Sequence, residues 1–197
     1  MNIFWLSVNF ILNAEWYSRE HRVKIILEIT QCLFSALYHH GNSSGDDSWK
    51  IGMTKVYKQA HKHHPVVLWI TEHPNNFRAA CIQALALCSV YTKYHKKTHA
   101  CETLIYQLMQ RTPTKSFTNV PFKDECFRAT VNIPLGCTPV PCCMPVEYII
   151  CDDNFNIDLT ASYTNYYLHT KLIFASGRLA HFDTMPPMLA NAYAKII

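Results

Sequence analysis

Polar side chains that could do acid–base chemistry recur on one face of a predicted helix near the start of the chain. His21, Lys24, Glu28 and Gln31 follow one another at steps of three, four and three residues, a spacing that places them on one face of an α-helix. Glu20 lies next to this row. If the face borders a cleft, these residues could supply a base, an amine and an imidazole. If it faces water, Lys24 and Glu28 form an ordinary surface ion pair.

A second set of candidate residues is basic and rich in histidine and tyrosine. It lies in residues 57–65 and 93–99. Lysine and histidine side chains can bind phosphate groups and tyrosine rings can stack on bases, so this set could bind nucleic acid. An exposed basic loop above core aromatic residues would have the same composition. With two arginines of the first helix included, the candidate nucleic-acid ligands are Arg19, Arg22, Lys58, His61, Lys62, His64, Lys97 and His99.

The same histidines could also form a metal site. His61 and His64 could chelate one ion on a helix, with His99 or Glu28 as the third ligand. Their spacing matches no named zinc motif, so we predict no metal. The chain has only five glycines and no glycine-rich phosphate loop, and we predict no cofactor. A metal-dependent enzyme for nucleotides or modified bases, built from these four residues and His21, is the alternative.

Hydrophobic periodicity predicts that helices position these residues. The first helix is predicted for residues 9–38, with an asparagine as its N-cap and Gly41 as its C-cap. Proline is favoured in the first turn of a helix, so further helices are predicted to begin at Pro65 and Pro74. The other predicted elements are helices over residues 99–111 and 157–176, and a short strand or extended lead-in over residues 2–8.

These elements predict a mainly α fold. It consists of a single compact helical domain with a short N-terminal strand and a proline-rich irregular segment towards the C-terminus. Residues 1–111 would form the helical core, residues 112–156 a proline-rich wrap, and residues 157–197 a C-terminal helix and a short tail. Closely spaced prolines break any long periodic element in the wrap.

The composition is that of a folded protein. Of the 197 residues, 49% are hydrophobic and 16% are charged, which excludes a disordered chain. The net charge of +4 permits an anionic partner. The nine cysteines include no C-x-x-C pair, which predicts reduced and mostly buried thiols. Because the chain has no run of about 18 apolar residues and no basic leader, we expect an intracellular protein that is neither secreted nor bound to a membrane.

The polar row on the first helix resembles a motif of a known family. This family comprises mostly uncharacterised proteins of bacteriophages and large DNA viruses, which begin with Met-Asn-Ile and an aromatic residue, as this chain does. Their first helix carries the pattern His-Val-Val-Lys-Met-x-x-Glu-x-x-Gln, to which residues 21–31 are similar. Arg19 and Glu20 stand where the family commonly has Asp-Lys. Further short matches include Tyr57, His61, His64, Trp69, Asn76, His99, Tyr163, Tyr166, Lys171 and Pro186.

Some members of this family are labelled pyrimidine-dimer DNA glycosylase. The phage endonuclease V type of that enzyme is a small all-α protein that uses its N-terminal amine as the nucleophile and a glutamate on its first helix. Residues 14–16, 19–20 and 22–23 are similar to its motif Ala-Glu-Tyr-Arg-Glu followed by Arg-Val. The resemblance implies that Glu20 is the acid–base group. It also implies that an amine, the N-terminus or Lys24, forms a Schiff base with C1′ of a sugar.

The leading hypothesis is therefore a viral DNA-processing enzyme of the glycosylase/AP-lyase type, with DNA as its partner. Its candidate catalytic residues are Glu20, His21, Lys24 and Glu28. The expected location is the cytoplasm or nucleus of an infected host cell. A non-enzymatic nucleic-acid-binding or virion protein is a further alternative, because the same basic and aromatic residues could bind without reacting.

Overall fold

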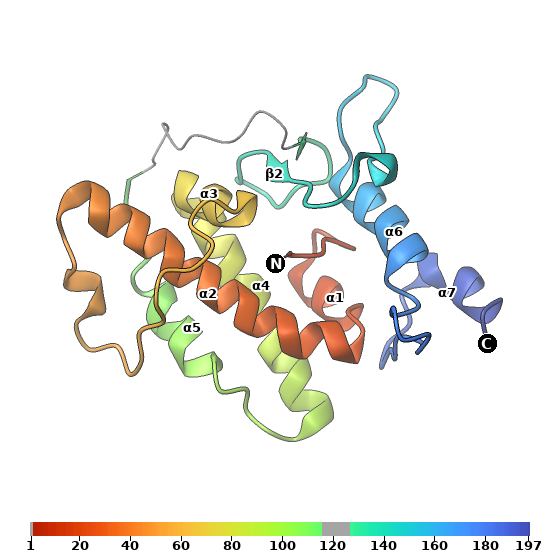
Figure 1. Cartoon of the computed structure of the whole chain (residues 1–197), viewed down its shortest axis with the longest axis horizontal. Helices are drawn as coiled ribbons and strands as arrows, with labels where there is room; N and C mark the ends of the chain where they lie inside the picture. Colours follow the sequence, from red (N-terminus) through yellow and green to blue (C-terminus); the bar gives the residue numbers. More distant parts are fainter. Residues whose placement is uncertain (1, 116–126) are drawn as a thin grey trace.

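Helices make up most of the fold (Figure 1). The structure is a computed structural model that describes residues 2–115 and 127–197. The helices of these residues are α1 (Phe10–Glu15), α2 (Arg19–Ser44), α3 (Pro65–Glu72), α4 (Pro74–His95), α5 (Glu102–Met109), α6 (Leu159–Thr170) and α7 (Pro187–Ala194). The strands β1 (Arg128–Ala129) and β2 (Val140–Pro141) pair antiparallel, and single 3-10 turns span Ser48–Lys50 and Val146–Tyr148. The predicted mainly α fold is confirmed.

The first predicted helix is interrupted once and extends further than expected. α1 and α2 are separate helices because Ser18 has an extended backbone (φ −62°, ψ 154°). Its hydroxyl oxygen caps α2 by accepting a hydrogen bond from the N–H of His21 at 3.4 Å. α2 continues past Gly41, the predicted C-cap, and ends at the left-handed Gly45 (φ 70°). The prediction at Gly41 was wrong because this glycine provides space inside the helix: a Cβ here would lie 3.0 Å from Nε1 of Trp49.

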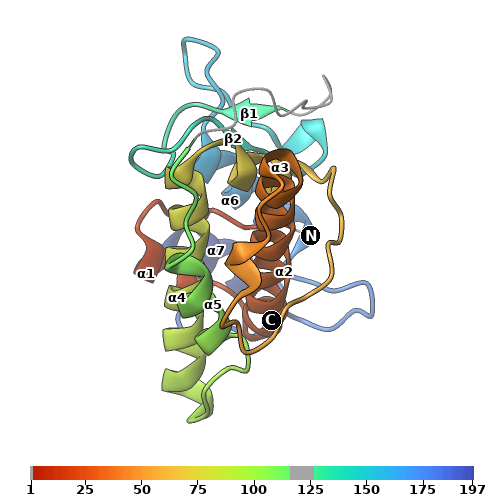
Figure 2. The same cartoon turned by 90° about the vertical axis from the view of Figure 1, so that its left-hand side faces the viewer.

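The core lies where α2 packs against α3 and α4, and α1 and α5 pack on α4 (Figure 2). α3 and α4 begin at Pro65 and Pro74, as predicted. The interface buries large apolar side chains such as Phe34 of α2 and Phe77 of α4. Each contributes roughly 1.5–3 kcal/mol relative to an exposed position. α2 is therefore held firmly along one side, while its polar row lies on another.

The N-terminal segment is extended rather than a strand, and it enters the core. Residues 3–6 are buried. The side chain of Asn13 replaces a neighbouring strand, because Oδ1 accepts from the N–H of Leu6 at 2.8 Å and Nδ2 donates to the carbonyl of Phe4 at 3.0 Å. The Tyr17 hydroxyl also donates to that carbonyl, at 2.7 Å. These bonds satisfy buried backbone groups and fix the segment beside α2.

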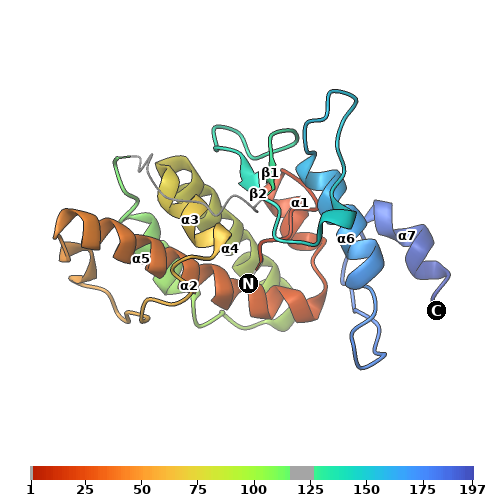
Figure 3. The same ribbon diagram turned by 45° about the horizontal axis from the view of Figure 1, so that its top comes forward.

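The last third of the chain packs in two places: β1 and β2 lie against α3, and the part from α6 onward packs at the beginning of α2 (Figures 1 and 3). α6 ends at Thr170, earlier than the predicted helix, because the chain turns back at Gly177 and pairs Ile173 with Leu179. The tail was predicted to be short and instead includes α7. Of the predicted proline-rich wrap, residues 116–126 lie outside the described part, and the rest carries β1 and β2. Within the two described ranges, no helix has the length and apolar character needed to cross a membrane.

Candidate functional site

The first half of α2 borders a polar pocket that the N-terminal segment and the end of α6 complete. Its volume is about 260 Å³. Three of the four residues predicted to be catalytic line it: His21, Lys24 and Glu28. The other lining residues are Asn2, Phe4, Ile25, Cys143, Tyr166 and Lys171. The polar row of α2 therefore borders a hollow that other parts of the chain close.

His21 belongs to a cluster of hydrogen-bonding groups at this pocket. Its Nδ1 lies 2.6 Å from the hydroxyl of Tyr167 and 3.1 Å from Oγ of Ser18. Burial lowers the pKa of His21 to about 4, and the positive charges of Lys171 and Lys24 act in the same direction. His21 is therefore neutral at physiological pH. A neutral imidazole can donate or accept a hydrogen bond without adding charge to the pocket.

Two lysines and one carboxylate set the charge of the pocket. Nζ of Lys24 lies 3.5 Å from Oε1 of Glu28, one turn further along α2. The Glu28 side chain is 16% exposed and that of Lys24 is 72% exposed, so the carboxylate lies deeper than the ammonium group. Lys171 follows α6 and places its Nζ 4.7 Å from the ring centre of Tyr166. With His21 neutral, two cations and one anion leave one excess positive charge, which favours an anionic ligand.

Asn2 and Lys171 were not among the predicted site residues. Asn2 is held at the pocket by two hydrogen bonds: Nδ2 donates to the carbonyl of Cys143 at 2.8 Å, and Oδ1 accepts from the hydroxyl of Tyr163 at 2.7 Å. Helical spacing gave no signal for either residue, since both come from other parts of the chain. The resemblance to the viral family did, because its matches include the Met-Asn-Ile opening and Lys171.

Glu20 comes just before His21 in α2, and its carboxylate is bound to groups of the C-terminal segment. Oε1 accepts from Nδ1 of His181 at 2.8 Å and lies 3.8 Å from Nη2 of Arg178. Burial opposes the shift, but the hydrogen bonds from His181 lower the pKa of Glu20. Glu28, which lines the pocket, is consequently the better placed carboxylate for chemistry there.

Arg19 and Arg22 both bind Asp183, which joins the start of α2 to the C-terminal segment. Nη1 of Arg22 lies 2.8 Å from Oδ2 of Asp183, and Nη2 of Arg19 lies 2.6 Å from Oδ1. Burial acts against the shift, yet the two guanidinium groups lower the pKa of Asp183. The Arg22 side chain is fully buried, so a nucleic acid cannot contact it. Its ion pair with Asp183 stabilises the fold instead.

The other predicted nucleic-acid ligands lie away from the pocket lining. The exposed ones are Lys58, His61, Lys62 and Lys97. His64 caps α3 by accepting from the N–H of Val66 at 3.2 Å, and His99 accepts from the N–H of Cys101 at 3.2 Å. In residues 2–115 and 127–197, no three His, Cys, Asp or Glu side chains gather in a way that could hold a metal ion. The ligand set of the metal-site alternative is therefore not assembled there.

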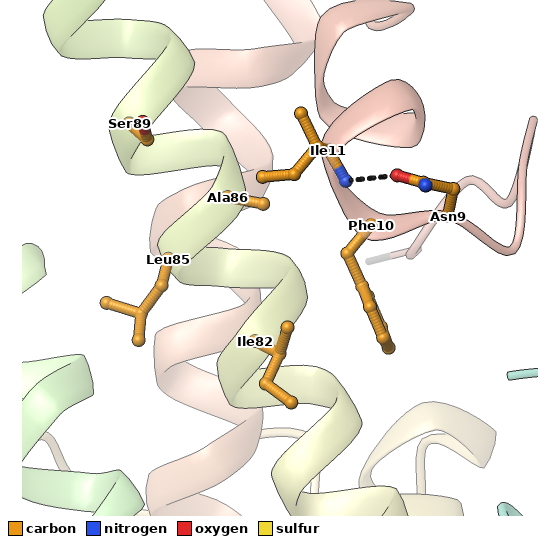
Figure 4. Close-up of a pocket in the computed structure, with 7 residues that line it drawn as sticks. All are labelled: Asn9, Phe10, Ile11, Ile82, Leu85, Ala86 and Ser89. Carbon is orange, nitrogen blue, oxygen red and sulfur yellow. Dashed lines mark hydrogen bonds between the residues drawn. The ribbon is translucent and has the colours of Figure 1, made fainter. Parts of the chain in front are cut away.

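A larger groove between α1 and α4 is apolar (Figure 4). It has a volume of about 440 Å³ and is lined by Asn9, Phe10, Ile11, Ile82, Leu85, Ala86 and Ser89. The side chain of Asn9 accepts a hydrogen bond from the N–H of Ile11 at 3.0 Å and so serves as the cap of α1 (Figure 4). None of the lining residues is ionisable. Acid–base chemistry is therefore better supported in the smaller polar pocket.

No protein-family model, curated protein or solved structure matches this chain.

Proposed function

We propose that this protein is a DNA-processing enzyme of the glycosylase/AP-lyase type, which acts on the deoxyribose of a damaged nucleotide. The supporting observation is that His21, Lys24, Glu28 and Lys171 line a single polar pocket. Schiff-base chemistry on a sugar phosphate needs an amine, a group that transfers protons and a cation that binds phosphate. The viral family that the chain resembles points to the same chemistry.

The proposed reaction at an abasic site begins when a neutral amine attacks C1′. A bond forms between the nitrogen and C1′, the C1′ oxygen leaves as water, and an iminium ion results. Removal of a proton from C2′ then expels the 3′ phosphate. The amine is that of Lys24 or the α-amine of Met1, which precedes Asn2 and lies outside the described residues. Glu28, 3.5 Å from the Lys24 amine, is the group proposed to take the proton that the ammonium form of the amine loses and to pass it to the C1′ oxygen as that oxygen leaves. The same carboxylate then accepts the proton from C2′.

The remaining pocket residues are proposed to bind the substrate. Lys171 supplies a positive charge for the phosphate, and neutral His21 supplies a hydrogen bond to a sugar oxygen. The pocket volume of about 260 Å³ is below the range of about 300–1,000 Å³ usual for drug-sized ligands. A sugar phosphate suits this size if its base lies outside the pocket.

Borohydride trapping on DNA with one abasic site tests the proposal, because reduction converts the iminium into a stable link between protein and DNA. The intact protein should form a covalent adduct, and peptide mapping should find it on Lys24 or Met1. Glu28→Gln should slow adduct formation by about 100-fold, since proton transfer by a positioned side chain contributes roughly that much.

Glu20→Gln is the matched control on the same helix and should keep most of the activity. The absence of any adduct with the intact protein would refute the proposed chemistry. Equal losses in the two glutamine variants would instead contradict the assignment of Glu28.

A second candidate is a nucleic-acid-binding protein without catalysis. It is favoured by the 72% exposure of Lys24 and its ion pair with Glu28, features that suit a phosphate contact as well as a nucleophile. In that case the protein should bind abasic DNA without forming an adduct or cleaving the strand. The affinity should then be unchanged in Glu28→Gln.

A further inference from the structure

The polar row of α2 continues beyond the pocket towards the C-terminal end of the helix. Ser35 follows Gln31 after four residues, and His39 follows Ser35 after another four. Positions that recur at three- and four-residue steps share one helix face. The face that begins with Lys24 and Glu28 at the pocket therefore passes through Ser35 and His39.

The segment between α2 and α3 is fixed to this same face. Oγ of Ser35 donates to the carbonyl of Ala60 at 2.7 Å and accepts from its N–H at 3.0 Å. One turn further on, Nε2 of His39 donates to the carbonyl of Lys62 at 2.8 Å. Figure 3 shows this segment running alongside α2. Three hydrogen bonds thus place the backbone of residues 60–62 over the second half of the polar face.

This segment is positively charged and accessible. Residues 55–63 contain three lysines and no acidic residue. Lys58 and Lys62 are exposed on either side of Ala60, whose backbone is bound to α2. Nζ of Lys55 lies 4.4 Å from the ring centre of Tyr57, which adds an aromatic ring to the same segment. Exposed lysines beside a tyrosine are the groups that contact phosphates and bases of a nucleic-acid strand.

A ligand that contacts both the pocket and this segment must be polymeric, because the two lie far apart. Ser35 lies 11 residues beyond Lys24, which corresponds to about 16 Å along the helix. A single nucleotide in the pocket would not reach Lys58 or Lys62. At about 3.4 Å per phosphate along a B-form strand, this distance takes up several nucleotides.

We propose that the substrate is a nucleic-acid strand with one nucleotide in the polar pocket and with its neighbouring phosphates on Lys58 and Lys62 along α2. This inference rests on the proposed function, because the strand path begins at the pocket. It adds the path of the strand beyond the pocket, over the segment between α2 and α3, and the unpaired state of the strand at the pocket. The small pocket accepts one unpaired residue, so the strand is single-stranded or locally opened at that point.

Binding of fluorescein-labelled oligonucleotides, measured by fluorescence anisotropy, tests this path. Single strands of two and of eight nucleotides, each with one stable abasic analogue, serve as probes. In Lys58→Gln/Lys62→Gln, the eight-nucleotide probe should bind about tenfold more weakly. The slope of the logarithm of its binding constant against the logarithm of the salt concentration should become less steep by about 1.4, or about 0.7 for each of the two lost phosphate contacts. The two-nucleotide probe should bind as it does to the unaltered protein.

A charge-matched control, Lys96→Gln/Lys195→Gln, removes two exposed lysines elsewhere and should leave the longer probe unaffected. Equal weakening in both double variants, or none in Lys58→Gln/Lys62→Gln, would overturn the proposed path. Polyglutamate of the same charge should displace the labelled eight-nucleotide probe less well than an unlabelled oligonucleotide does. If the two displace it equally well, the proposed path is overturned, because the segment would then bind any polyanion.

Pocket variants separate this inference from the proposed function. Lys24→Gln/Lys171→Gln should weaken the binding of both probes if the strand begins in the pocket. If this variant leaves both probes unaffected, the pocket is not the binding site, and both proposals fail. If Lys24→Gln/Lys171→Gln weakens the binding of both probes while Lys58→Gln/Lys62→Gln changes the binding of neither, the proposed function stands and the strand path fails.

Discussion

The hydroxyl of Tyr167 lies 2.6 Å from Nδ1 of His21. Tyr167 is buried in α6, and burial raises the pKa of its phenol, so the hydroxyl keeps its proton. We therefore expect the hydroxyl to donate this proton to Nδ1 of the neutral His21 ring. The hydrogen of the neutral His21 ring is then on Nε2, which leaves Nε2 to act as a donor to a ligand.

Tyr167→Phe should change which nitrogen of His21 carries the hydrogen. Without the phenol, the Oγ of Ser18 remains 3.1 Å from Nδ1, which can then become the donor in that contact. We expect the imidazole 15N signals to shift towards the Nδ1–H tautomer and any activity on abasic DNA to fall. The loss of stability should be about 1 kcal/mol, the usual value for one hydrogen bond.

Tyr163→Phe is the matched control for that experiment. Tyr163 is equally buried in α6, but its hydroxyl donates to Asn2 rather than His21. Its removal should leave the His21 signals unchanged. An unchanged tautomer in Tyr167→Phe would show that Tyr167 does not set the state of His21.

The stability of the protein should fall as the pH decreases from about 6.5 to about 4. The pKa of His21 is about 4 in the folded state because of its burial, whereas a histidine in an unfolded chain has a pKa of about 6.5. In this range the unfolded state binds a proton that the folded state does not, so acidification favours unfolding. The loss from His21 should reach about 3 kcal/mol at pH 4, at 1.36 kcal/mol per pH unit. Above pH 6.5 this contribution should be constant.

Urea unfolding at a series of pH values measures this effect. His40, whose pKa burial also lowers to about 4, acts in the same direction. His21→Gln should therefore flatten the curve between pH 6.5 and 4 without abolishing the slope. His63→Gln, at an exposed position, controls for the removal of a histidine. A curve for His21→Gln that parallels the unaltered protein would contradict a buried, neutral His21.

Removal of the Asp183 carboxylate should destabilise the fold strongly. The Arg22 side chain is fully buried, that of Asp183 is 3% exposed, and their atoms lie 2.8 Å apart. Asp183→Ala would leave a buried guanidinium group without its counter-charge, and such changes cost about 3–5 kcal/mol. Thermal and urea unfolding should both show this loss. Asp153→Ala, at an exposed aspartate, should change stability by less than about 0.5 kcal/mol.

A double variant tests the cause of that loss. Arg22→Leu/Asp183→Leu removes both charges and should be more stable than Asp183→Ala, because no unpaired charge is left in the interior. If the double variant is the less stable of the two, the packing of these side chains matters more than their charges.

The helices could be predicted from the sequence where local residues determine their ends. Pro65 and Pro74 begin α3 and α4 because proline is suited to a first turn. The break at Ser18 has a local component, because this serine caps α2, but it also depends on contacts with the N-terminal segment. Asn13 and Tyr17 hold the N-terminal segment through Leu6 and Phe4. Hydrophobic periodicity carries no information about such contacts, so residues 9–38 were predicted as one helix.

The candidate site could likewise be predicted only where its residues are close together in the sequence. The three- and four-residue spacing of His21, Lys24 and Glu28 was sufficient to predict a shared face. It could not predict that Lys171 faces them, nor that Arg22 is buried, since the partner of Arg22 is 161 residues away in the sequence. An arginine next to this polar row is expected to bind phosphate. Only the fold shows that Arg22 binds Asp183 instead.

Gly41→Ala should destabilise the protein, although alanine usually stabilises a helix interior by about 1 kcal/mol relative to glycine. Gly41 lies within α2, and a Cβ there would meet Nε1 of Trp49 and the carbonyl of Asp46, each at 3.0 Å. Trp49 packs edge-on against Tyr38 of the same helix, with ring centres 5.0 Å apart, so it has limited room to move. Overpacking of this kind costs roughly 1–3 kcal/mol, and we expect a net loss in urea unfolding. Asn42→Ala, at the next and exposed position of α2, should be neutral or stabilising. A Gly41→Ala variant more stable than the unaltered protein would mean that the turn carrying Trp49 moves aside at no cost.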